Sequence, residues 1–457
     1  MKHTEITRRG FLAWSGLALG TALKRSAGAA SESGQTRPNI VFLMADDMGF
    51  ERVGLYGGKG CHTPNLDRMA SEGVRFDYCY AAPICTPTRV MLMTGKFNHR
   101  NYTFFSQYPK GQRCFAQDFR DAGYATAIID KWQLGGVTPK ELGFDEYCLF
   151  NYGKYGSPGA AERYWHPAIG ANDQTVETTE SDYGPDIFLK RCQDFVRGNK
   201  DRPFLLYWAL GAPHAPYAPT PESDDPKAKP DLRYYPDIVS RLDKNVGELI
   251  ATVDELGLAR NTLILFAGDN GTPHGVKTEM PDGRAIEGRK GSMADAGTHV
   301  PFIARWKGVI PPGTVRDDLM TLCDLYPTFA EAAGIDVGQR RLDGASQLSA
   351  MKGQAKPARD WAFMSYKSQW PGPNGKHNVA AWVKDHRWKL YDAGKIFDLQ
   401  NDPDEKTPAA TPEAEEAKRR LQPIIARMGA TPEAMKTFRD TNVRVRPKGR
   451  KGENGDD

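Results

Sequence analysis

The sequence predicts an α/β fold, with a large, mostly parallel β-sheet sandwiched by helices and a small C-terminal α+β subdomain that has an antiparallel sheet. Three observations support this prediction. Short apolar runs lack strict alternation, as expected for strands that are covered on both faces. Amphipathic helical segments lie between these runs, which favours parallel strands joined by crossover helices. After about residue 345 the pattern changes to short runs typical of antiparallel strands.

The apolar runs predict five strands of the main sheet, at residues 40–44, 125–129, 204–210, 263–266 and 302–306. Helical spacing predicts one helix that is capped by Thr63-Pro64 and ended by Gly73. It predicts a second helix at residues 186–196 and a third that Asp237 opens and Gly257 stops.

The C-terminal pattern predicts four short strands and a final helix, at residues 361–366, 380–383, 388–391, 395–399 and 412–428. We therefore expect a main α/β domain at residues 38–345, a C-terminal subdomain at 346–440 and a flexible tail at 441–457. Residues 149–183 are rich in glycine, tyrosine and tryptophan and read as a long connection. Connections of this length are usually functional or disordered.

The composition excludes several classes of protein. The chain has 457 residues, of which 40% are hydrophobic, and its mean hydropathy is −0.57. These values suit a large buried core and exclude a collagen, a disordered chain and a multi-span membrane protein. The net charge of +4 arises entirely within residues 1–29, so the rest of the chain is formally neutral. No basic field argues for a nucleic-acid partner.

The first 30 residues resemble a twin-arginine-type signal peptide. Arg8-Arg9 precede an apolar stretch at residues 11–23 that is too short to span a bilayer, and small residues at 27–29 suit cleavage. We therefore expect export through the twin-arginine machinery of a bacterium, to the periplasm or the medium. The mature chain is expected to contain no transmembrane segment.

The seven cysteines show no CxxC spacing, so a structural zinc site is not expected. Their odd number leaves at least one thiol unpaired or modified. Most of the others are expected to be buried as small hydrophobic residues.

Polar residues follow four of the predicted strands directly. They are Asp46-Asp47, Asp130-Lys131, His214 and Asp269-Asn270. In open α/β sheets, ligands bind outside the carboxyl ends of the strands, so these groups are expected to meet there. The acidic pairs supply the hard oxygen ligands that Ca²⁺ or Mg²⁺ prefers.

A fifth motif, Cys85-Thr86-Pro87-Thr88-Arg89, opens a predicted apolar helix. The N-terminus of a helix favours an anion. Arg89 adds a planar fork suited to sulfate or phosphate oxygens.

This pentapeptide, followed by Thr94-Gly95, resembles the signature of the type I, formylglycine-dependent sulfatases of the alkaline-phosphatase-like superfamily. The resemblance extends from Pro38 to about Gly353, and more weakly to Leu399. Further matching segments are Asn39–Asp47, Lys131–Gly135, Pro213–Pro216, Gly268–Gly271, Lys290–Pro301 and Asp398–Pro403.

The resemblance implies that Cys85 is oxidised to Cα-formylglycine (3-oxoalanine) by a formylglycine-generating or sulfatase-maturating enzyme. In the family, the formylglycine hydrate attacks sulfur and displaces the alcohol, and its second hydroxyl then expels sulfate. Arg89 and Lys131 would steady the hydrate and the sulfate, and His214 and Lys290 would bind sulfate and assist the leaving group. One Ca²⁺ would be held by Asp46, Asp47, Asp269 and Asn270, with modified Cys85 as a further ligand.

The chain departs from the family pattern at several positions. Gln133 stands where the family usually has a histidine, and a glutamine cannot exchange a proton near neutral pH. Asp295 and Ala296 replace Glu and Gly, and His299 replaces an arginine. The expected substrate is a sulfate ester, with a carbohydrate sulfate favoured because aromatic residues at 149–183 could stack on sugar rings.

Two alternatives stay open. The first is a phosphate or phosphonate ester hydrolase of the same superfamily. The Asp-Asp and Asp-Asn pairs speak against it, because phosphonate monoester hydrolases usually have Asp-Gln and Asp-His. The second is a sulfoglycan-binding pseudoenzyme, which Gln133 motivates and the other retained site residues disfavour.

Overall fold

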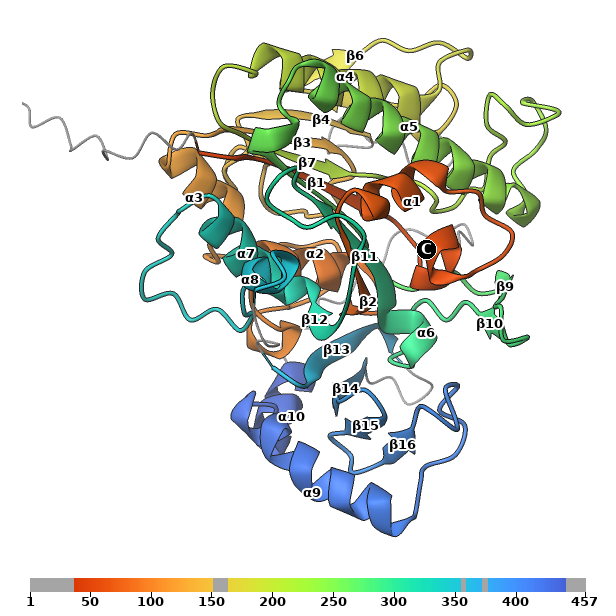
Figure 1. The fold of residues 1–457 in the computed structure, drawn as a ribbon, viewed down its shortest axis with the longest axis vertical. Helices are drawn as coiled ribbons and strands as arrows, with labels where there is room; N and C mark the ends of the chain where they lie inside the picture. Colours follow the sequence, from red (N-terminus) through yellow and green to blue (C-terminus); the bar gives the residue numbers. More distant parts are fainter. Residues whose placement is uncertain (1–36, 151–162, 355–358, 372–376, 441–457) are drawn as a thin grey trace, which may run out of the picture. The chain divides into compact units, whose positions relative to one another are not determined.

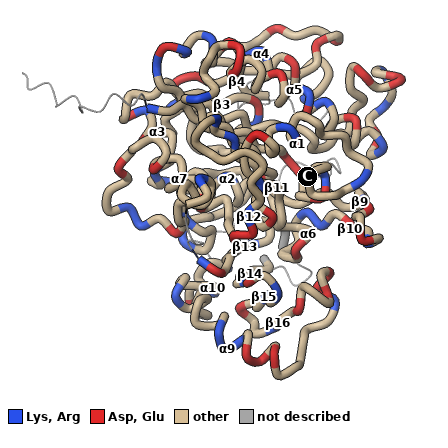
Figure 2. Tube along the Cα trace, in the orientation of Figure 1, with Lys and Arg blue, Asp and Glu red and all other residues tan. Residues whose placement is uncertain are grey.

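The computed structural model describes residues 37–150, 163–354, 359–371 and 377–440. The predicted signal peptide, the predicted tail and part of the 149–183 segment, including Tyr152 and Tyr155, lie outside the described residues. Within the described residues, no helix combines the length and apolar character needed to cross a bilayer. Charged residues of both signs are interspersed along the described chain (Figure 2), in keeping with the neutral balance.

A ten-stranded sheet forms the centre of the main domain, in the order β12-β2-β11-β8-β1-β7-β3-β4-β5-β6 (Figure 1). The strands from β8 to β4 run parallel, and β2 is parallel to β12. β11 is antiparallel to both of its neighbours, and β5 and β6 form an antiparallel edge. The bounds are β1 Asn39–Ala45, β2 Val74–Tyr80, β3 Ala125–Asp130, β4 Glu146–Phe150, β5 Ile169–Ala171, β6 Gln174–Val176, β7 Phe204–Ala209, β8 Thr262–Gly268, β11 His299–Arg305 and β12 Thr314–Thr321.

All five predicted strands of the main sheet are confirmed, as β1, β3, β7, β8 and β11. Every residue of these strands is buried, which explains why their sequences show continuous apolar runs rather than alternation. The prediction that residues 149–183 form a single connection is wrong in part, because β5 and β6 lie within it. Each of these strands has only three residues, too few to show as an apolar run in the sequence.

Two hydrophobic cores cover the two faces of the sheet. Alternate residues of β1 point to opposite sides, with Phe42 in one core and Leu43 in the other. One face packs against α2 Cys85–Thr94, α3 Phe115–Asp121 and α7 Leu325–Ala332, and the other against α1 Pro64–Ser71, α4 Gly184–Gly198 and α5 Tyr235–Glu255.

The three predicted helices are confirmed as α1, α4 and α5, with changes at their ends. α5 begins two residues before Asp237, and Gly257 follows it with φ 72°, a left-handed value that suits glycine. The Thr63 side chain does not cap α1, because its hydroxyl oxygen instead accepts a hydrogen bond of 2.8 Å from the Gly54 amide.

The C-terminal part has a four-stranded antiparallel sheet, as predicted, in the order β13-β14-β15-β16. The bounds are β13 Ala362–Pro371, β14 His377–Lys384, β15 Trp388–Tyr391 and β16 Ile396–Asp398. The predicted helix is α9 Pro412–Arg427, but it is not the final one, because α10 Pro432–Asp440 follows it. All seven cysteines are unpaired, and six of them are buried.

The remaining strands and α-helices of the described residues are two short antiparallel strands, β9 Lys277–Glu279 and β10 Ala285–Glu287, and two one-turn helices, α6 Asp295–Thr298 and α8 Leu348–Met351. α6 follows the Lys290 loop and leads directly into β11, so that loop is tied to the main sheet.

Candidate active site

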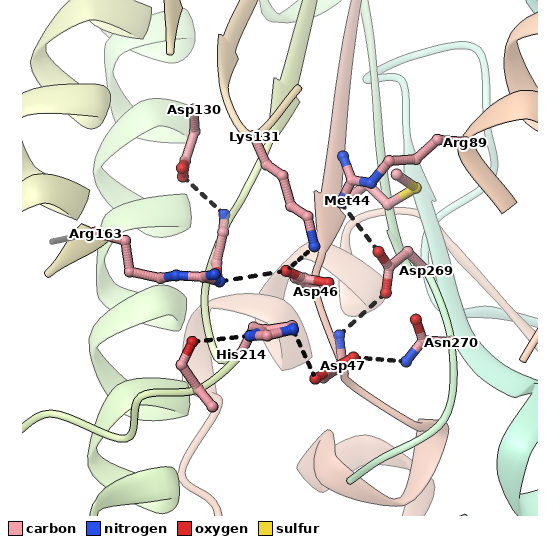
Figure 3. Close-up of polar contacts among 12 residues, drawn as sticks. Met44, Asp46, Asp47, Arg89, Asp130, Lys131, Arg163, His214, Asp269 and Asn270 are labelled. Carbon is pink, nitrogen blue, oxygen red and sulfur yellow. Dashed lines mark hydrogen bonds and ion pairs between the residues drawn. The ribbon is translucent and has the colours of Figure 1, made fainter. Parts of the chain in front are cut away.

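The four strand-end motifs meet at one edge of the main sheet (Figure 3). β1 and β8 are parallel neighbours in a register that pairs Ala45 with Gly268, so the residues that follow each strand lie side by side. The Asp269 amide donates to the Ala45 carbonyl over 2.9 Å, and the Lys131 amide donates to the Ala209 carbonyl over 2.9 Å. The predicted convergence at the carboxyl ends of parallel strands is therefore confirmed.

The acidic residues form a buried cluster that suits a hard cation. The Asp47 amide donates to Asp269 Oδ1 over 3.1 Å, and Asn270 Nδ2 donates to Asp47 Oδ1 over 2.8 Å. The side-chain oxygens Asp46 Oδ1 and Asn270 Oδ1 are buried and have no hydrogen-bond partner among the described residues. One ligand atom each from Asp46, Cys85 and Asp269 lies within 4.8 Å of the others. Orphaned buried oxygens of this kind fit a divalent metal.

Each carboxylate of this cluster also faces a cation. Arg89 donates to Asp269 Oδ2 over 3.0 Å, Lys290 donates to Asp47 Oδ2 over 3.0 Å, and Lys131 bonds to Asp46 Oδ2. These contacts place both predicted anion-binding cations, Arg89 and Lys131, against the predicted metal ligands.

The cations and the burial act in opposite directions on the carboxyl pKa values. Burial acts to raise the pKa of Asp46, but the positive charge of Lys131 and its neighbours outweighs it, so this pKa lies well below its usual value. The pKa of Asp47 is lowered in the same way, mainly by Lys290 against burial. At Asp269, burial and the negative charge of Asp46 prevail over Arg89 and raise the pKa to about 8. A divalent cation would relieve this crowding of negative charge.

Cys85 is the first residue of α2 and is almost completely buried. Ile84 and Tyr366 pack beside it, and burial raises the pKa of the thiol. Arg89 lies one turn further along α2, so both residues face the acidic cluster. The predicted placement of the motif at the start of a helix is confirmed.

His214 and Lys290 form a pair beside Asp47. His214 Nδ1 lies 2.8 Å from the Ala215 carbonyl, which can only accept, so Nδ1 carries the proton and Nε2 is free to accept. Lys290 Nζ lies 3.2 Å from Nε2 and can donate to it. Burial, helped by the charges of Arg163 and Lys290, lowers the pKa of His214 to about 3 in spite of Asp47 and Asp46.

The loop that carries Lys290 is fixed by backbone hydrogen bonds. The Lys290 amide donates to the Thr272 carbonyl over 3.0 Å, and the Gly291 amide donates to the Pro83 carbonyl over 2.8 Å. The second bond ties this loop to the segment just before Cys85. Gly291 has φ 85°, a conformation that favours glycine.

Within the described part of the chain, Gln133 is the one predicted site residue that makes no hydrogen bond or ion pair with the cluster. It is half-buried with φ 50°, and its side-chain oxygen is buried without a partner among the described residues. Its predicted position in the sulfate pocket stays a prediction.

Sequence reasoning missed Arg163 and the role of Asp130 beside it. Arg163 NH1 lies 3.7 Å from Asp46 Oδ2, and Figure 3 shows the side chain directed at Asp46 next to Lys131. Asp130 Oδ2 accepts a hydrogen bond of 2.9 Å from the Gly211 amide, and burial raises its pKa to about 7. No motif marks Arg163, because it lies in the 149–183 segment.

The mixed sheet with a buried acidic cluster at its carboxyl edge is the architecture of the alkaline-phosphatase-like hydrolases. The crystal structure of Ps i-CgsB matches with a TM-score of 0.71 and 26% identity, over 89% of this chain and 94% of that one. The Phosphonate Monoester Hydrolase of Agrobacterium radiobacter matches with a TM-score of 0.67 and 18% identity, over 86% of this chain and 96% of that one. The second likeness shows the fold alone.

The chain belongs to the sulfatase family, because residues 38–335 match the Sulfatase family model. Residues 289–429 also match the model for the C-terminal region of N-sulphoglucosamine sulphohydrolase. N-acetylgalactosamine-6-sulfatase of Sus scrofa is 30% identical over 430 residues, which cover 86% of this chain and 80% of that one. Arylsulfatase G of Rattus norvegicus is 29% identical over 475 residues, which cover 87% and 88%. The protein is therefore an enzyme that hydrolyses sulfuric esters.

Proposed function

We propose that this sulfatase hydrolyses carbohydrate sulfate esters with a formylglycine made from Cys85 and one bound calcium ion. The observation that carries the proposal is the cluster in which Cys85 Sγ lies within 4.8 Å of carboxylate oxygens of Asp46 and Asp269. A cysteine thiol buried among carboxylates is a poor nucleophile, because burial raises its pKa. The oxidised residue is an aldehyde, and its hydrate would instead supply a hydroxyl nucleophile at this position.

The calcium ion would be held by oxygen atoms of Asp46, Asp47, Asp269 and Asn270. When bound, it would compensate the charge of the carboxylates and polarise an oxygen of the sulfate group. The donor set supports a hard cation, since it consists of carboxylate and amide oxygens and two of these oxygens are otherwise without a partner.

Arg89 and Lys131 would hold the sulfate group. Arg89 uses one NH2 contact for Asp269, and its Nε and NH1 atoms are buried without a partner among the described residues. Each of these two donors is available to a sulfate oxygen, and bonds from a guanidinium to an anion are charge-assisted. Lys131 is anchored next to them by the backbone bond to β7.

The Lys290–His214 pair would handle the leaving group. Because His214 Nδ1–H is committed to the Ala215 carbonyl, Nε2 faces Lys290 as an acceptor. Burial acts to lower the pKa of Lys290, but the Asp47 carboxylate outweighs it and raises this pKa, so Lys290 stays an ammonium. The ammonium, aligned by His214, would stabilise the charge that develops on the departing oxygen.

Two features support a carbohydrate substrate. The relatives reported above include N-acetylgalactosamine-6-sulfatase. In this chain, Trp165 is half-buried and packs on the buried Tyr183 with ring centroids 5.0 Å apart. A partly exposed aromatic ring is suited to stacking on a sugar ring.

We also infer that the enzyme is exported by the twin-arginine machinery and acts in the periplasm or outside the cell. The basis is the pattern within residues 1–30. The predicted division into a catalytic domain at 38–345 and a C-terminal subdomain at 346–440 belongs to the same proposal, and it is supported by the separate sheets.

The test is hydrolysis by enzyme purified from a host that matures sulfatases. Mass spectrometry of the Cys85 peptide should show loss of the thiol and gain of the aldehyde. Sulfate release from sulfated monosaccharides should then exceed release of product from a phenylphosphonate monoester. A fully active preparation with an unmodified Cys85 thiol would overturn the formylglycine proposal, and a preference for the phosphonate would support the hydrolase alternative. Binding of a sulfated glycan without turnover would support the pseudoenzyme alternative.

A further inference from the structure

Arg163 is a fourth cation at the catalytic cluster, in addition to Arg89, Lys131 and Lys290. Its NH1 atom lies 3.7 Å from Asp46 Oδ2, the same oxygen that Lys131 contacts. The guanidinium also lies over the Phe150 ring, 4.8 Å from its centroid, which fixes the plane of the fork. The next residue, Tyr164, donates its hydroxyl to the His214 carbonyl over 2.7 Å, so the backbone here is tied to the active site.

The hydrogen bonds of Arg163 are incomplete. Among the described residues, its NH1 atom donates a hydrogen bond of 3.3 Å to the Gly211 carbonyl, and its buried Nε has no partner. This Nε–H is therefore a donor available to a ligand. Its place beside the catalytic cluster distinguishes it from the unpartnered Nε atoms of Arg52 and Arg75.

The four cations are at two depths. The side chains of Arg89 and Lys131 are 1% and 3% exposed, whereas those of Lys290 and Arg163 are each 11% exposed. The two deep cations suit the sulfate group itself. The two rim cations suit the part of the substrate that extends from the sulfate towards solvent.

The charges also favour a substrate with more than one negative group. In the described part of the cluster, these four cations face the carboxylates Asp46, Asp47 and Asp269. Asp130 is a fourth acid close to Arg163. Even with all four acids ionised, a bound divalent cation would leave two positive charges, whereas a sulfate monoester brings a single negative charge.

We propose that Arg163 binds a second anionic group of the substrate, so that the enzyme prefers sulfate esters with a carboxylate or another sulfate close to the scissile ester. Acidic saccharides have this chemistry. The proposal rests on the proposed function, because it names the substrate class of the same site. It makes Arg163 a specificity-determining residue rather than part of the bond-breaking machinery.

The kinetic test compares two chromogenic substrates that differ in one group. One is 4-nitrophenyl sulfate with a carboxylate beside the ester, and the other has a carboxamide there. In Arg163→Met, kcat/KM for the carboxylate substrate should fall about 10- to 100-fold, the effect of losing one charge-assisted hydrogen bond. The value for the carboxamide substrate should fall less, so that the ratio of the two kcat/KM values drops about tenfold or more. Arg163→Lys, which keeps the charge and loses the fork, should lie between the native enzyme and Arg163→Met.

A matched control is Arg241→Met. Arg241 lies in α5 and pairs with Asp186 and Glu222 outside the cluster, so both substrates should behave as with the native enzyme. An equal fall for both substrates in Arg163→Met would mean that Arg163 serves the sulfate or Asp46, and would overturn the proposal. No change for either substrate would also overturn it.

A binding test separates this proposal from the proposed function. Calorimetry with calcium-loaded Cys85→Ala protein needs no turnover, and aryl sulfonates lack the scissile S–O ester bond. A sulfonate with a neighbouring carboxylate should bind about tenfold more tightly than its carboxamide counterpart, and Arg163→Met should abolish this preference. Equal affinities would overturn the proposal even in an active sulfatase. If the preference is present and the matured enzyme releases no sulfate, the proposed function fails and the role of Arg163 stands.

Discussion

Asp269 joins the helix that carries Cys85 to the acidic cluster, because its two oxygens bond to different partners. Oδ1 accepts from the Asp47 amide and Oδ2 accepts from Arg89. We expect Asp269→Asn to weaken calcium binding by at least about 100-fold, because it replaces a proposed carboxylate ligand. Loss of a residue that only hydrogen-bonds to a metal ligand already weakens metal binding about 10- to 100-fold. Sulfate release should fall with it, and calorimetric titration with Ca²⁺ is the measurement.

The control for this substitution is Asp324→Asn. Asp324 is equally buried and pairs with Arg359 over 2.5 Å, away from the active site. Its replacement should lower the melting temperature and leave the calcium affinity unchanged. Full activity of Asp269→Asn after exhaustive chelation would rule out the assigned metal site.

At position 133 the chain has a glutamine where the sulfatase family usually has a histidine, so a proton-exchanging side chain is missing there. Without a titratable group there, we expect release of bound sulfate to be slow relative to its formation. Pre-steady-state kinetics with an aryl sulfate should show a burst of phenol with the native enzyme and a smaller burst with Gln133→His. General acid–base help is worth about 10²–10⁴-fold, so the difference should be measurable. No burst, together with an inactive Gln133→His enzyme, would assign Gln133 to substrate recognition instead.

At the scale of elements, the C-terminal sheet holds the loop that carries Lys290. Glu405 Oε1 accepts from the Asp295 amide over 2.8 Å and from Lys389 Nζ over 2.8 Å, and Lys389 also donates to the Met293 carbonyl over 2.6 Å. The Glu405 and Lys389 side chains are 4% and 0% exposed. The loop is therefore fixed from both sides, by the main sheet and by the C-terminal subdomain.

We expect Glu405→Gln to disturb this loop, because it leaves the buried Lys389 without its carboxylate. Breaking a buried pair costs about 3–5 kcal/mol in unfolding free energy. The kcat for sulfate release should fall as the Lys290 ammonium moves from His214, while the calcium affinity should not change. Asp398→Asn is the control, since Asp398 pairs with the partly exposed Arg387 on the same subdomain. A loss of stability with native kcat in Glu405→Gln would contradict the positioning role.

The same scale shows what the sequence can predict. The strands β1, β3, β7, β8 and β11 can be predicted from the sequence, because burial on both faces requires continuous apolar runs. β12 has four polar residues among its first five, Thr314–Asp318, so tertiary pairing with β2 decides its conformation.

The candidate site likewise contains residues that the sequence predicts and residues that it does not. The ligands at strand ends follow from the topology of parallel sheets, and each lies in a compact motif. Arg163 and Glu405 come from connecting segments, and their positions depend on how the chain folds back over the sheet. The spacing of residues within a segment does not indicate such long-range contacts, so the sequence analysis did not identify these two residues.

At the scale of the whole molecule, His99 joins the main domain to the C-terminal part. It lies in the 3-10 helix Asn98–Arg100, with Nδ1 2.9 Å from the Ser365 hydroxyl and Nε2 3.0 Å from the Met428 carbonyl. The carbonyl can only accept, so neutral His99 carries its proton on Nε2 and accepts from Ser365 at Nδ1. Protonation would remove that acceptor.

This contact predicts how stability depends on pH. Burial, with the charge of Arg100, lowers the pKa of His99 from 6.5 to about 4. Because the unfolded chain binds this proton first, the contribution of His99 is complete above about pH 6.5 and is lost as the pH falls towards 4. One such group changes the unfolding free energy by at most about 1.4 kcal/mol per pH unit, and by less here because His99 is partly exposed. Urea unfolding of the native protein and of His99→Gln at pH 7.5 and 5.0 measures this contribution. Between the two pH values, the native protein should lose more unfolding free energy than His99→Gln does. The control is His386→Gln, at an exposed site, which should lose as much as the native protein. Equal losses in the native protein and His99→Gln would show that other groups set the acid sensitivity of this junction.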